Sequence, residues 1–407
     1  MIADDPEIDV AEAWEKEVKA LERLKLEKIA HSVRFVNKLC LFDNDSTDYY
    51  MIFEWADGGS LQTLWQEQQK PQLNASLVKW ACRQLHGLAL ALHTAHDLEG
   101  DFNIRHGDLK PNNILWFKAK AQDDGFGTLK IADWGLAKEH SDKTVLRAYD
   151  TTARWGTKRY EAPEVKRARL RKFDKAKSAH LEVPGQPKPM DVRSRLSDIW
   201  AMGCIALEYL IWLLYGLDEL QRFKHEIGED TQPFFVIEDD ETQRLLPVVE
   251  RWMNHMSGEA LCSKDTALGN LLECIKSGLL VCTLPPNKGD RSNSYPLPTN
   301  VPERPPSNND ANPDAPSFQF QLTRTDTAKS SALAGSNCRL LASEFMEEMH
   351  KITAADANSS EDFWFVESTP SPPPMEGTSS SSPGEQGGPE NNVSKASRLE
   401  KPEALIV

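Results

Sequence analysis

Residues 104–116 constrain the fold of this 407-residue chain more than any other stretch. They place an acid, Asp108, a base, Lys110, and an amide, Asn113, within six residues. Three such side chains converge on one point only when the backbone between them is rigid, and Pro111 adds rigidity by fixing its own φ and restricting the residue before it. Apolar residues flank the polar ones, so the stretch predicts an active-site loop held between two buried segments.

The charge of the chain limits its partners. It has 62 acidic and 47 basic residues, and its formal net charge is -15 at pH 7. This excess of acid keeps a chain soluble and disfavours nonspecific binding to nucleic acid, so no nucleic-acid partner is expected. The densest basic run, which begins at Lys166 and ends at Lys177, is interpreted as a solvated loop. Nuclear import or docking of an acidic partner is the alternative.

Cysteine usage and apolar runs indicate the compartment. Seven cysteines are scattered without a CxxC pair, which predicts neither a disulfide framework nor a zinc site and favours an intracellular location, cytoplasmic or nuclear. The acidic start of the chain is unlike a presequence, so no targeting segment is expected. The most apolar run, 201–217, carries Glu208 in its middle and predicts a buried core helix, so no membrane contact is expected.

The periodicity of the apolar residues predicts the main elements. Residues 8–25 have helical spacing, and the β-branched and aromatic runs 33–42 and 48–55 flank a polar turn, which predicts an antiparallel strand pair. Ser60 is expected to cap a short helix, and Asn74 or Ser76 a longer one through residue 96. Further helices are expected over 196–215, 217–227, 241–255, 264–280 and 340–352, and short strands over 114–117 and 128–132.

Three further motifs follow the loop in order. Asp133, Trp134 and Gly135 come directly after a predicted strand, residues 156–164 end in Ala-Pro-Glu, and residues 197–204 open a core helix with Ser-Asp-Ile-Trp. With residues 106–113, they resemble the catalytic loop, the metal-binding DFG and the APE end of the activation segment in eukaryotic protein kinases. Any one of them alone is weak, because an isolated Asp-x-Gly is usually a turn. Their order and spacing identify the chain as a member of that superfamily over about residues 8–283 and 338–352.

This resemblance implies an α+β, protein-kinase-like bilobal fold with a truncated small lobe of one helix and two strands and a mainly α-helical large lobe. Residues 284–336 are rich in Pro, Asn, Ser, Asp and Thr, a composition that does not bury enough apolar surface to order a chain. The expected parts are therefore a partial small lobe over 1–56, a large lobe over 57–283, a disordered insert over 284–337, a C-terminal kinase helix over 338–366 and a disordered tail over 367–407.

The resemblance also implies roles for the polar residues. Asp108 accepts or orients the proton of the substrate hydroxyl, Lys110 lies against the transferring γ-phosphate of ATP, and Asn113 and Asp133 hold Mg²⁺, which prefers hard oxygen ligands. Lys110 and Thr157 resemble the Ser/Thr branch of the family, so the implied substrate is a serine or threonine hydroxyl of a protein.

The nucleotide side of the site is implied by two further matches. Phe53, Glu54, Trp55 and Ala56 resemble the gatekeeper and hinge, whose backbone hydrogen-bonds adenine; read alone, they are an apolar strand end. Glu17 matches the αC glutamate that pairs with the ATP-binding lysine; read alone, it is a solvated helix residue.

Packing partners are implied as well. Leu21, His106 and Trp134 are expected to stack in the internal spine, and Asp198 to support the catalytic loop from below. Arg339 is paired with Glu164 as the buried ion pair of the family, with Arg291 as the alternative. Choosing Arg339 makes residues 284–337 an insert inside the domain.

Two departures from the family pattern stand out. Only sixteen residues precede Glu17, and none of them is glycine, so neither a glycine-rich loop nor a strand lysine is expected before it. Lys16 and Lys19 are the nearest candidates for that lysine, but they are predicted to lie on the same helix as Glu17. Gly107 stands where most regulated kinases have an arginine that engages a phosphorylated activation loop, which puts control at Ser141, Thr144, Thr151 or Thr152 in doubt. Arg105 does not substitute for it by position in the sequence.

The sequence therefore predicts a Ser/Thr protein kinase that is incomplete at its front, and little activity from this chain. One hypothesis is a true kinase whose coding sequence upstream of Met1 supplies the missing strands. The alternative is a catalytically impaired pseudokinase or scaffold that binds a protein partner. A small-molecule kinase of related fold is disfavoured by the APE segment and Thr157.

Overall fold

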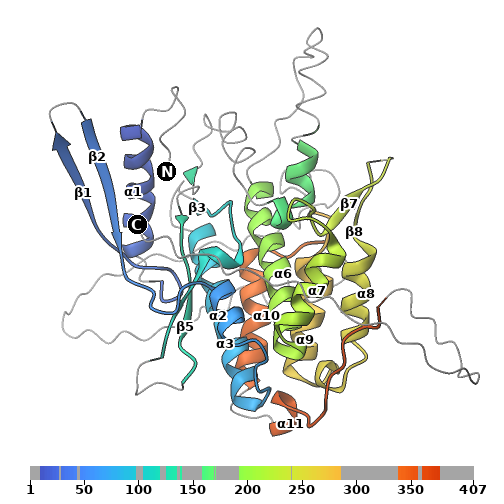
Figure 1. Cartoon of the computed structure of the whole chain (residues 1–407). Helices are drawn as coiled ribbons and strands as arrows, with labels where there is room; N and C mark the ends of the chain where they lie inside the picture. The colour runs from blue at the N-terminus through green and yellow to red at the C-terminus, as the bar shows by residue number, and fades with distance from the viewer. Residues whose placement is uncertain are drawn as a thin grey trace, which may run out of the picture. The chain divides into compact units, whose positions relative to one another are not determined.

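The computed structural model of the chain is shown in Figure 1. It describes residues 10–26, 29–43, 46–97, 104–119, 125–134, 138–139, 158–168, 170, 192–239, 241–285, 338–355 and 360–375. The described helices and strands belong to one compact unit that ends at Pro372. Apart from its first two residues, the expected insert 284–337 lies outside the described residues, as does the tail beyond residue 375.

The elements follow in this order: α1 (Val10–Leu26), β1 (Phe35–Asp43), β2 (Ser46–Phe53), α2 (Leu61–Glu67), α3 (Ala75–His96), β3 (Ile104–Arg105), η1 (Pro111–Asn113), β4 (Ile114–Phe117), β5 (Thr128–Ile131), β6 (Lys138–Glu139), η3 (Lys158–Tyr160), α6 (Val192–Tyr215), α7 (Leu217–Ile227), β7 (Phe235–Ile237), β8 (Gln243–Leu245), α8 (Pro247–Met256), η4 (Ala260–Cys262), α9 (Ala267–Cys274), η5 (Ile275–Leu279), α10 (Ala342–Ala354) and α11 (Glu361–Trp364). The small two-stranded sheets and the many helices confirm the predicted α+β class.

The small lobe consists of α1 packed against the β1–β2 hairpin, as Figure 1 shows. The rings of Trp14 on α1 and Tyr49 on β2 lie 5.0 Å apart. Because successive side chains of a strand alternate between faces, Leu39 and Tyr50, which are paired across the hairpin, point away from this contact and are 45% and 46% exposed. The predicted helix and strand pair are therefore confirmed. Among the described residues, α1 covers one face of the hairpin, and the face that carries Leu39 and Tyr50 is exposed.

The loop between α1 and β1 fixes the small lobe to the strand that leads to Asp133. Ile131 on β5 donates its N–H to the carbonyl of His31 and accepts one from Val33, both at 2.8 Å. His31 also packs directly on α3, where a Cβ at Gly87 would lie 2.2 Å from the imidazole ring. Glycine at position 87 thus permits the close approach of loop and helix.

The helices of the large lobe surround α6, whose residues from Leu196 to Tyr215 are almost all buried. By length and composition, one helix in the described part of the chain, Arg195–Tyr215, is apolar enough to span a membrane, and 94% of that window is buried inside the protein. The predicted core helix is therefore confirmed. Helix α10 packs against α3 and α9, and Phe345, Met349 and Ile352 join the same hydrophobic core.

Two of the predicted helix starts are confirmed by their capping residues, and one is wrong. The hydroxyl of Ser60 accepts the N–H of Thr63, and the side chain of Asn74, rather than Ser76, caps α3. The helix predicted over 241–255 is wrong at its start, because residues 243–245 form β8 against β7. Helix α8 begins only at Pro247, since proline lacks an N–H and suits the first turn of a helix.

The C-terminal segment retains defined contacts beyond the expected boundary at residue 367. Trp364 is buried beside α3, where the ammonium of Lys79 lies 5.5 Å from its ring. Further along, Ser371 donates its N–H to Glu259 at 2.9 Å, and its carbonyl lies 2.6 Å from Nε2 of His255. The interpretation of residues from 367 onward as a structureless tail is therefore wrong for residues up to Ser371.

Candidate active site

The catalytic loop is held from below by one buried carboxylate, that of Asp198 on α6. Its Oδ1 accepts the N–H of Gly107, and its Oδ2 accepts the N–H of His106, each at 2.9 Å. Nε2 of His96, at the end of α3, lies 2.9 Å from the same Oδ2. Burial alone would raise the pKa of Asp198, but the hydrogen bond and charge of His96 outweigh it and lower the pKa. The predicted support by Asp198 is confirmed, whereas the role of His96 was not predicted.

His106 makes the loop rigid on its other side. Its Nδ1 accepts the N–H of Asp108 at 3.2 Å, and its Nε2 lies 2.8 Å from the carbonyl of Ala132, to which it donates in the neutral tautomer. Complete burial lowers the pKa of His106, so the neutral ring is favoured. The rings of His106 and Trp134 are 4.9 Å apart and tilted by 52°, which confirms the predicted contact between them, and Leu21 is buried in the same core.

The three polar side chains of the catalytic loop converge on one point. The ammonium of Lys110 lies 2.7 Å from Oδ2 of Asp108. The amide nitrogen of Asn113 donates to the backbone carbonyl of Asp108 at 2.9 Å and lies 3.4 Å from its Oδ2. Asn113 is buried, while Asp108 and Lys110 are half-buried, so the carboxylate and the ammonium remain accessible from one side.

The loop and the Asp133 segment are linked through their backbones. Strands β4 and β5 pair antiparallel, and just beyond them the N–H of Ala132 donates to the carbonyl of Asn113 at 2.8 Å. Asp133 follows with φ of 60°, an uncommon conformation for a residue with a side chain, and its carboxylate is exposed. Asn113 and Asp133 are thereby positioned at neighbouring points of the site.

Glu17 on α1 completes the acidic side of the site. It is half-buried, and burial together with the nearby charge of Asp133 raises its pKa to about 7. The structure therefore brings Glu17 toward Asp133, as its assignment to αC requires. No hydrogen bond or ion pair joins Glu17 to another described residue, and Lys19 on the same helix is exposed. The cation that the family pattern places opposite this glutamate is thus not among the described residues.

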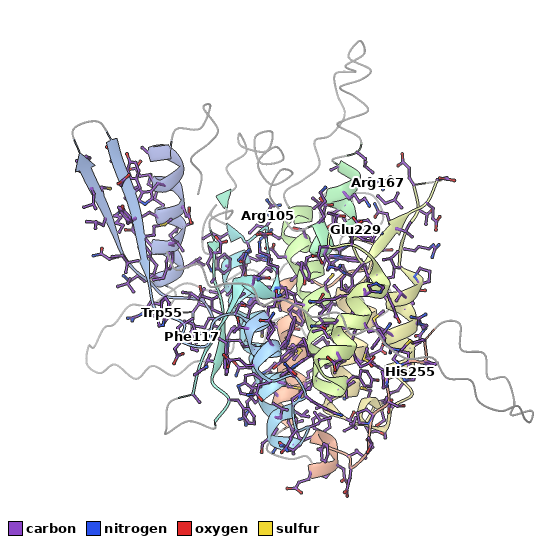
Figure 2. All side chains as sticks on the ribbon, viewed as in Figure 1. Trp55, Arg105, Phe117, Arg167, Glu229 and His255 are labelled. Carbon is purple, nitrogen blue, oxygen red and sulfur yellow. The ribbon has the colours of Figure 1, made fainter. Side chains whose placement is uncertain are left out.

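The predicted hinge residues follow β2. Oε1 of Glu54 accepts the backbone N–H of Arg34 and lies 2.7 Å from the ammonium of Lys130 on β5. Phe53 is 38% exposed, and Trp55, labelled in Figure 2, is 86% exposed. The side chain of Glu54 therefore fixes the hinge to the strand before Asp133, a contact that the sequence did not indicate.

Backbone groups of the hinge are open to a ligand. Among the described residues, none forms a hydrogen bond with the N–H of Ala56 or the carbonyl of Glu54. Directly after them, Gly58 donates its N–H to the carbonyl of Trp116 at 3.0 Å, and a Cβ at Gly58 would lie 2.5 Å from that indole ring. Glycine thus lets the hinge pack against the strand that follows the catalytic loop.

The APE segment is joined to the end of the domain by an ion pair. Nη1 and Nη2 of Arg339 lie 2.7 and 3.1 Å from the two carboxylate oxygens of Glu164. The predicted pair is confirmed, and the alternative partner, Arg291, lies outside the described residues. Nearby, the hydroxyl of Tyr160 donates to the buried carboxylate of Glu208, which also pairs with Lys224 at 3.0 Å.

A site built in this way suits a nucleotide and a divalent cation. The described residues contain no cluster of three or more His, Cys, Asp or Glu side chains able to bind a metal alone. Mg²⁺ does not require such a cluster, because it takes one or two protein oxygens and shares the rest of its coordination with phosphates and water. Asn113 donates through its nitrogen, which leaves Oδ1 available, and Asp133 has an exposed carboxylate. The fold and the site together define the protein-kinase-like class of phosphotransferases.

Comparisons with known proteins agree with that class. A family model described as the protein kinase domain matches residues 3–265. Serine/threonine-protein kinase RAD53 of Saccharomyces cerevisiae is 29% identical over 191 residues, which is 47% of this chain and 19% of the relative. Mitogen-activated protein kinase pmk-3 of Caenorhabditis elegans is 26% identical over 243 residues, which is 56% of this chain and 43% of the relative. Mitogen-activated protein kinase kinase kinase 11 of Homo sapiens is 29% identical over 208 residues, which is 51% of this chain and 20% of the relative.

The chain belongs to the protein kinase family, because the family model spans more than half of it. Its matched regions span less than half the length of these curated relatives. Membership implies ATP and a divalent metal as cofactors and protein hydroxyls as substrates.

Proposed function

We propose that this chain carries the catalytic machinery of an ATP-dependent serine/threonine protein kinase. The observation that supports it best is the convergence of Asp108, Lys110 and Asn113 on a loop that is anchored to Asp198 and, through the ring of His106, to Ala132. Phosphoryl transfer requires positioning and charge neutralisation rather than covalent chemistry by the protein, and a rigid loop supplies both.

The residues have separate tasks in this proposal. Asp108 orients the serine or threonine hydroxyl and accepts its proton, and Lys110, already 2.7 Å from that carboxylate, offsets negative charge at the same point. Asn113 and Asp133 would hold Mg²⁺, and the backbone of Glu54 and Ala56 would hydrogen-bond adenine. When bound, ATP supplies the transferable phosphoryl group, and the metal ion reduces the repulsion between its phosphates and the incoming hydroxyl.

Among the described residues, the nucleotide-binding part of the site is less complete than the catalytic loop. Glu17 lacks a cationic partner among the described residues, so this part of the chain does not supply the lysine that the glutamate would orient toward the α- and β-phosphates. We therefore expect low turnover from the 407-residue chain on its own. The same observation favours the second candidate function, a catalytically impaired scaffold that binds a protein partner.

A phosphotransfer assay separates the two. The full chain is incubated with Mg²⁺, γ-labelled ATP and a mixed Ser/Thr peptide library, beside Asp108→Ala and Asp133→Ala. A kinase gives label transfer that both substitutions reduce by about 100-fold or more, because each removes a group that acts in the transition state. Asp265→Ala, at an exposed position, is the matched control and keeps the activity. Transfer that is absent, or that survives Asp108→Ala, would favour the scaffold.

We also propose an intracellular location and an acidic partner at the basic run. The seven cysteines are all free thiols, which supports a reducing, intracellular compartment. In the basic run, Arg167 pairs with Glu241 of the same chain at 2.8 Å, and most residues from 169 to 177 lie outside the described residues. An acidic partner at Lys166 to Lys177 would thus compete with an internal carboxylate for Arg167.

A further inference from the structure

Residues 369–374 read Thr-Pro-Ser-Pro-Pro-Pro, a sequence that restricts the backbone at every position. Each proline fixes its own φ, and a residue that precedes a proline is held in the extended or polyproline II region, as Thr369 and Ser371 are here. None of the described helices or strands includes these residues, in agreement with an extended conformation. The sequence therefore favours a polyproline II helix, which has three residues per turn. Residues 369–375 are called the proline segment below.

The proline segment is anchored to the large lobe. Trp364, five residues before it, is buried in the hydrophobic core. The backbone of Ser371 is held at both of its polar groups, because its N–H donates to Glu259 at 2.9 Å and its carbonyl lies 2.6 Å from Nε2 of His255. Figure 1 shows the chain running from α11 toward α8 at this point. An anchored ligand loses less conformational entropy when a partner binds it.

A period of three residues gives the proline segment three edges. Pro370 and Pro373 share one edge, and they are half-buried and buried, respectively. Ser371 and Pro374 share the next edge, and both are exposed. The third edge consists of residues 369, 372 and 375, of which Met375 is 64% exposed. One edge is therefore covered, and side chains on the other two are accessible to a partner.

The anchoring contacts do not use the exposed proline ring. They involve the indole of Trp364 and the backbone of Ser371, whereas the ring of Pro374 is exposed. A polyproline II helix has no internal hydrogen bonds, and its conformation is set before binding. Proteins recognise such helices with grooves lined by aromatic side chains, which pack on the proline rings. The proline segment has the conformation and the exposed rings that this mode of recognition requires.

Charge around the proline segment has one sign. Residues 360–376 include four acidic residues and no lysine or arginine. Among them, Glu367 is exposed and lies two residues before Thr369. Because complementary charges favour association and opposed ones suppress it, a groove with a basic rim fits this segment better than a groove with an acidic rim.

We propose that the proline segment is a docking ligand for a protein whose groove is lined by aromatic rings and rimmed by arginine or lysine. The rings pack on Pro374 and on the third edge, and the basic rim faces Glu367. The partner binds the segment in place, because the covered edge takes no part in the contact. The chain thus presents a recruiting surface that is formed by none of the active-site residues.

The first experiment measures binding of the full chain to two probes by calorimetry. One is a WW domain of the class that binds proline runs, with arginine beside its aromatic groove, and the other is an SH3 domain with an acidic rim. The WW domain is expected to bind with a Kd of about 100 µM or lower, and about tenfold more tightly than the SH3 domain. A Kd above about 1 mM for both probes overturns the proposal, and equal affinities overturn the choice of a basic rim.

Substitutions on different edges separate side-chain contact from backbone stiffness. Pro374→Ala removes a ring from an open edge and should weaken binding of the WW domain by about tenfold or more. Pro370→Ala releases the backbone in the same way but alters the covered edge, so the affinity should stay within about threefold. Equal losses in the two variants overturn the assignment of the edges. If thermal unfolding shows that Pro374→Ala is destabilised, Met375→Ala on the other open edge serves as the test.

A synthetic peptide of residues 366–378 tests the role of the anchor. Because Glu259 and His255 hold the backbone of Ser371, the full chain should bind the WW domain about threefold or more tightly than the peptide does. Glu259→Ala removes the acceptor of the Ser371 N–H and should bring the affinity of the chain close to that of the peptide. A peptide that binds more tightly than the chain would show that the segment is masked, which overturns binding in place.

Discussion

Glu164 and Arg339 form a two-point ion pair between residues 175 positions apart in the sequence, with Nη1–Oε1 and Nη2–Oε2 distances of 2.7 and 3.1 Å. Arg339 also donates to the carbonyls of Val281 and Leu196, so one side chain joins the APE segment, α6 and the chain on both sides of the long segment 286–337. The residues after this segment are thus part of the kinase core.

Breaking this pair on one side is expected to be strongly destabilising. Arg339 is fully buried, so Glu164→Gln leaves its charge without a counter-ion and should lower the free energy of unfolding by about 3–5 kcal/mol. Urea denaturation measures the loss. The exposed pair Glu348 and Lys351 is the control, because Lys351→Gln should change the stability by less than about 0.5 kcal/mol. Equal effects at the two pairs would contradict this assignment.

Asp198→Asn should loosen the catalytic loop. The carboxylate accepts two backbone N–H groups and a histidine, whereas an amide turns an NH₂ toward one of these donors. We expect a loss of about 3 kcal/mol or more in the free energy of unfolding, since a buried charged network is broken. Faster hydrogen exchange at the amides of His106 and Gly107 is the specific readout. Asp218→Asn, on an exposed helix position, should leave both amides protected.

The sequence predicted the parts of the site that depend on local spacing. Asp108, Lys110 and Asn113 lie within one short loop, so their convergence follows from a rigid backbone, and the α6 motif located Asp198. The pairing of Arg339 with Glu164 was implied by the resemblance to protein kinases, because the residues that begin at Arg339 resemble the last helix of that fold.

What the sequence did not predict depends on contacts between distant segments. Nothing in the sequence near His96 or Glu54 indicates that they contact Asp198 and Lys130. Strand β8 was mistaken for a helix start, because three residues are too few to define a period.

The two faces of the β1–β2 hairpin should respond differently to substitution. Phe35 is buried, and its ring lies 5.8 Å from that of Phe53, so Phe35→Ala should cost about 3–5 kcal/mol. Leu39 is 45% exposed, and Leu39→Lys should change the free energy of unfolding by less than about 0.5 kcal/mol. Because this face carries further apolar side chains, the same substitution should reduce concentration-dependent association in sedimentation. A large loss of stability from Leu39→Lys would show that the face is covered.

Glu17 should make the stability of the protein fall with rising pH. Its pKa is raised from 4.5 to about 7 by burial and by the charge of Asp133. A carboxyl group whose pKa is higher in the folded state binds a proton that the unfolded chain releases, so its contribution is fully present below pH 4.5 and is lost as pH rises to about 7. Since Glu17 is half-buried and partly screened by water, the effect should be about 1–2 kcal/mol.

The measurement is the pH dependence of the difference between wild type and Glu17→Gln. Glutamine resembles the neutral acid and does not titrate, so the variant should match the wild type near pH 4.5 and exceed its stability above pH 7. Glu15→Gln, at an exposed position of the same helix, should show no such divergence. A cation bound opposite Glu17 from outside the described residues would favour the carboxylate form. In that case Glu17→Gln would be less stable than the wild type above pH 7, which would contradict this prediction.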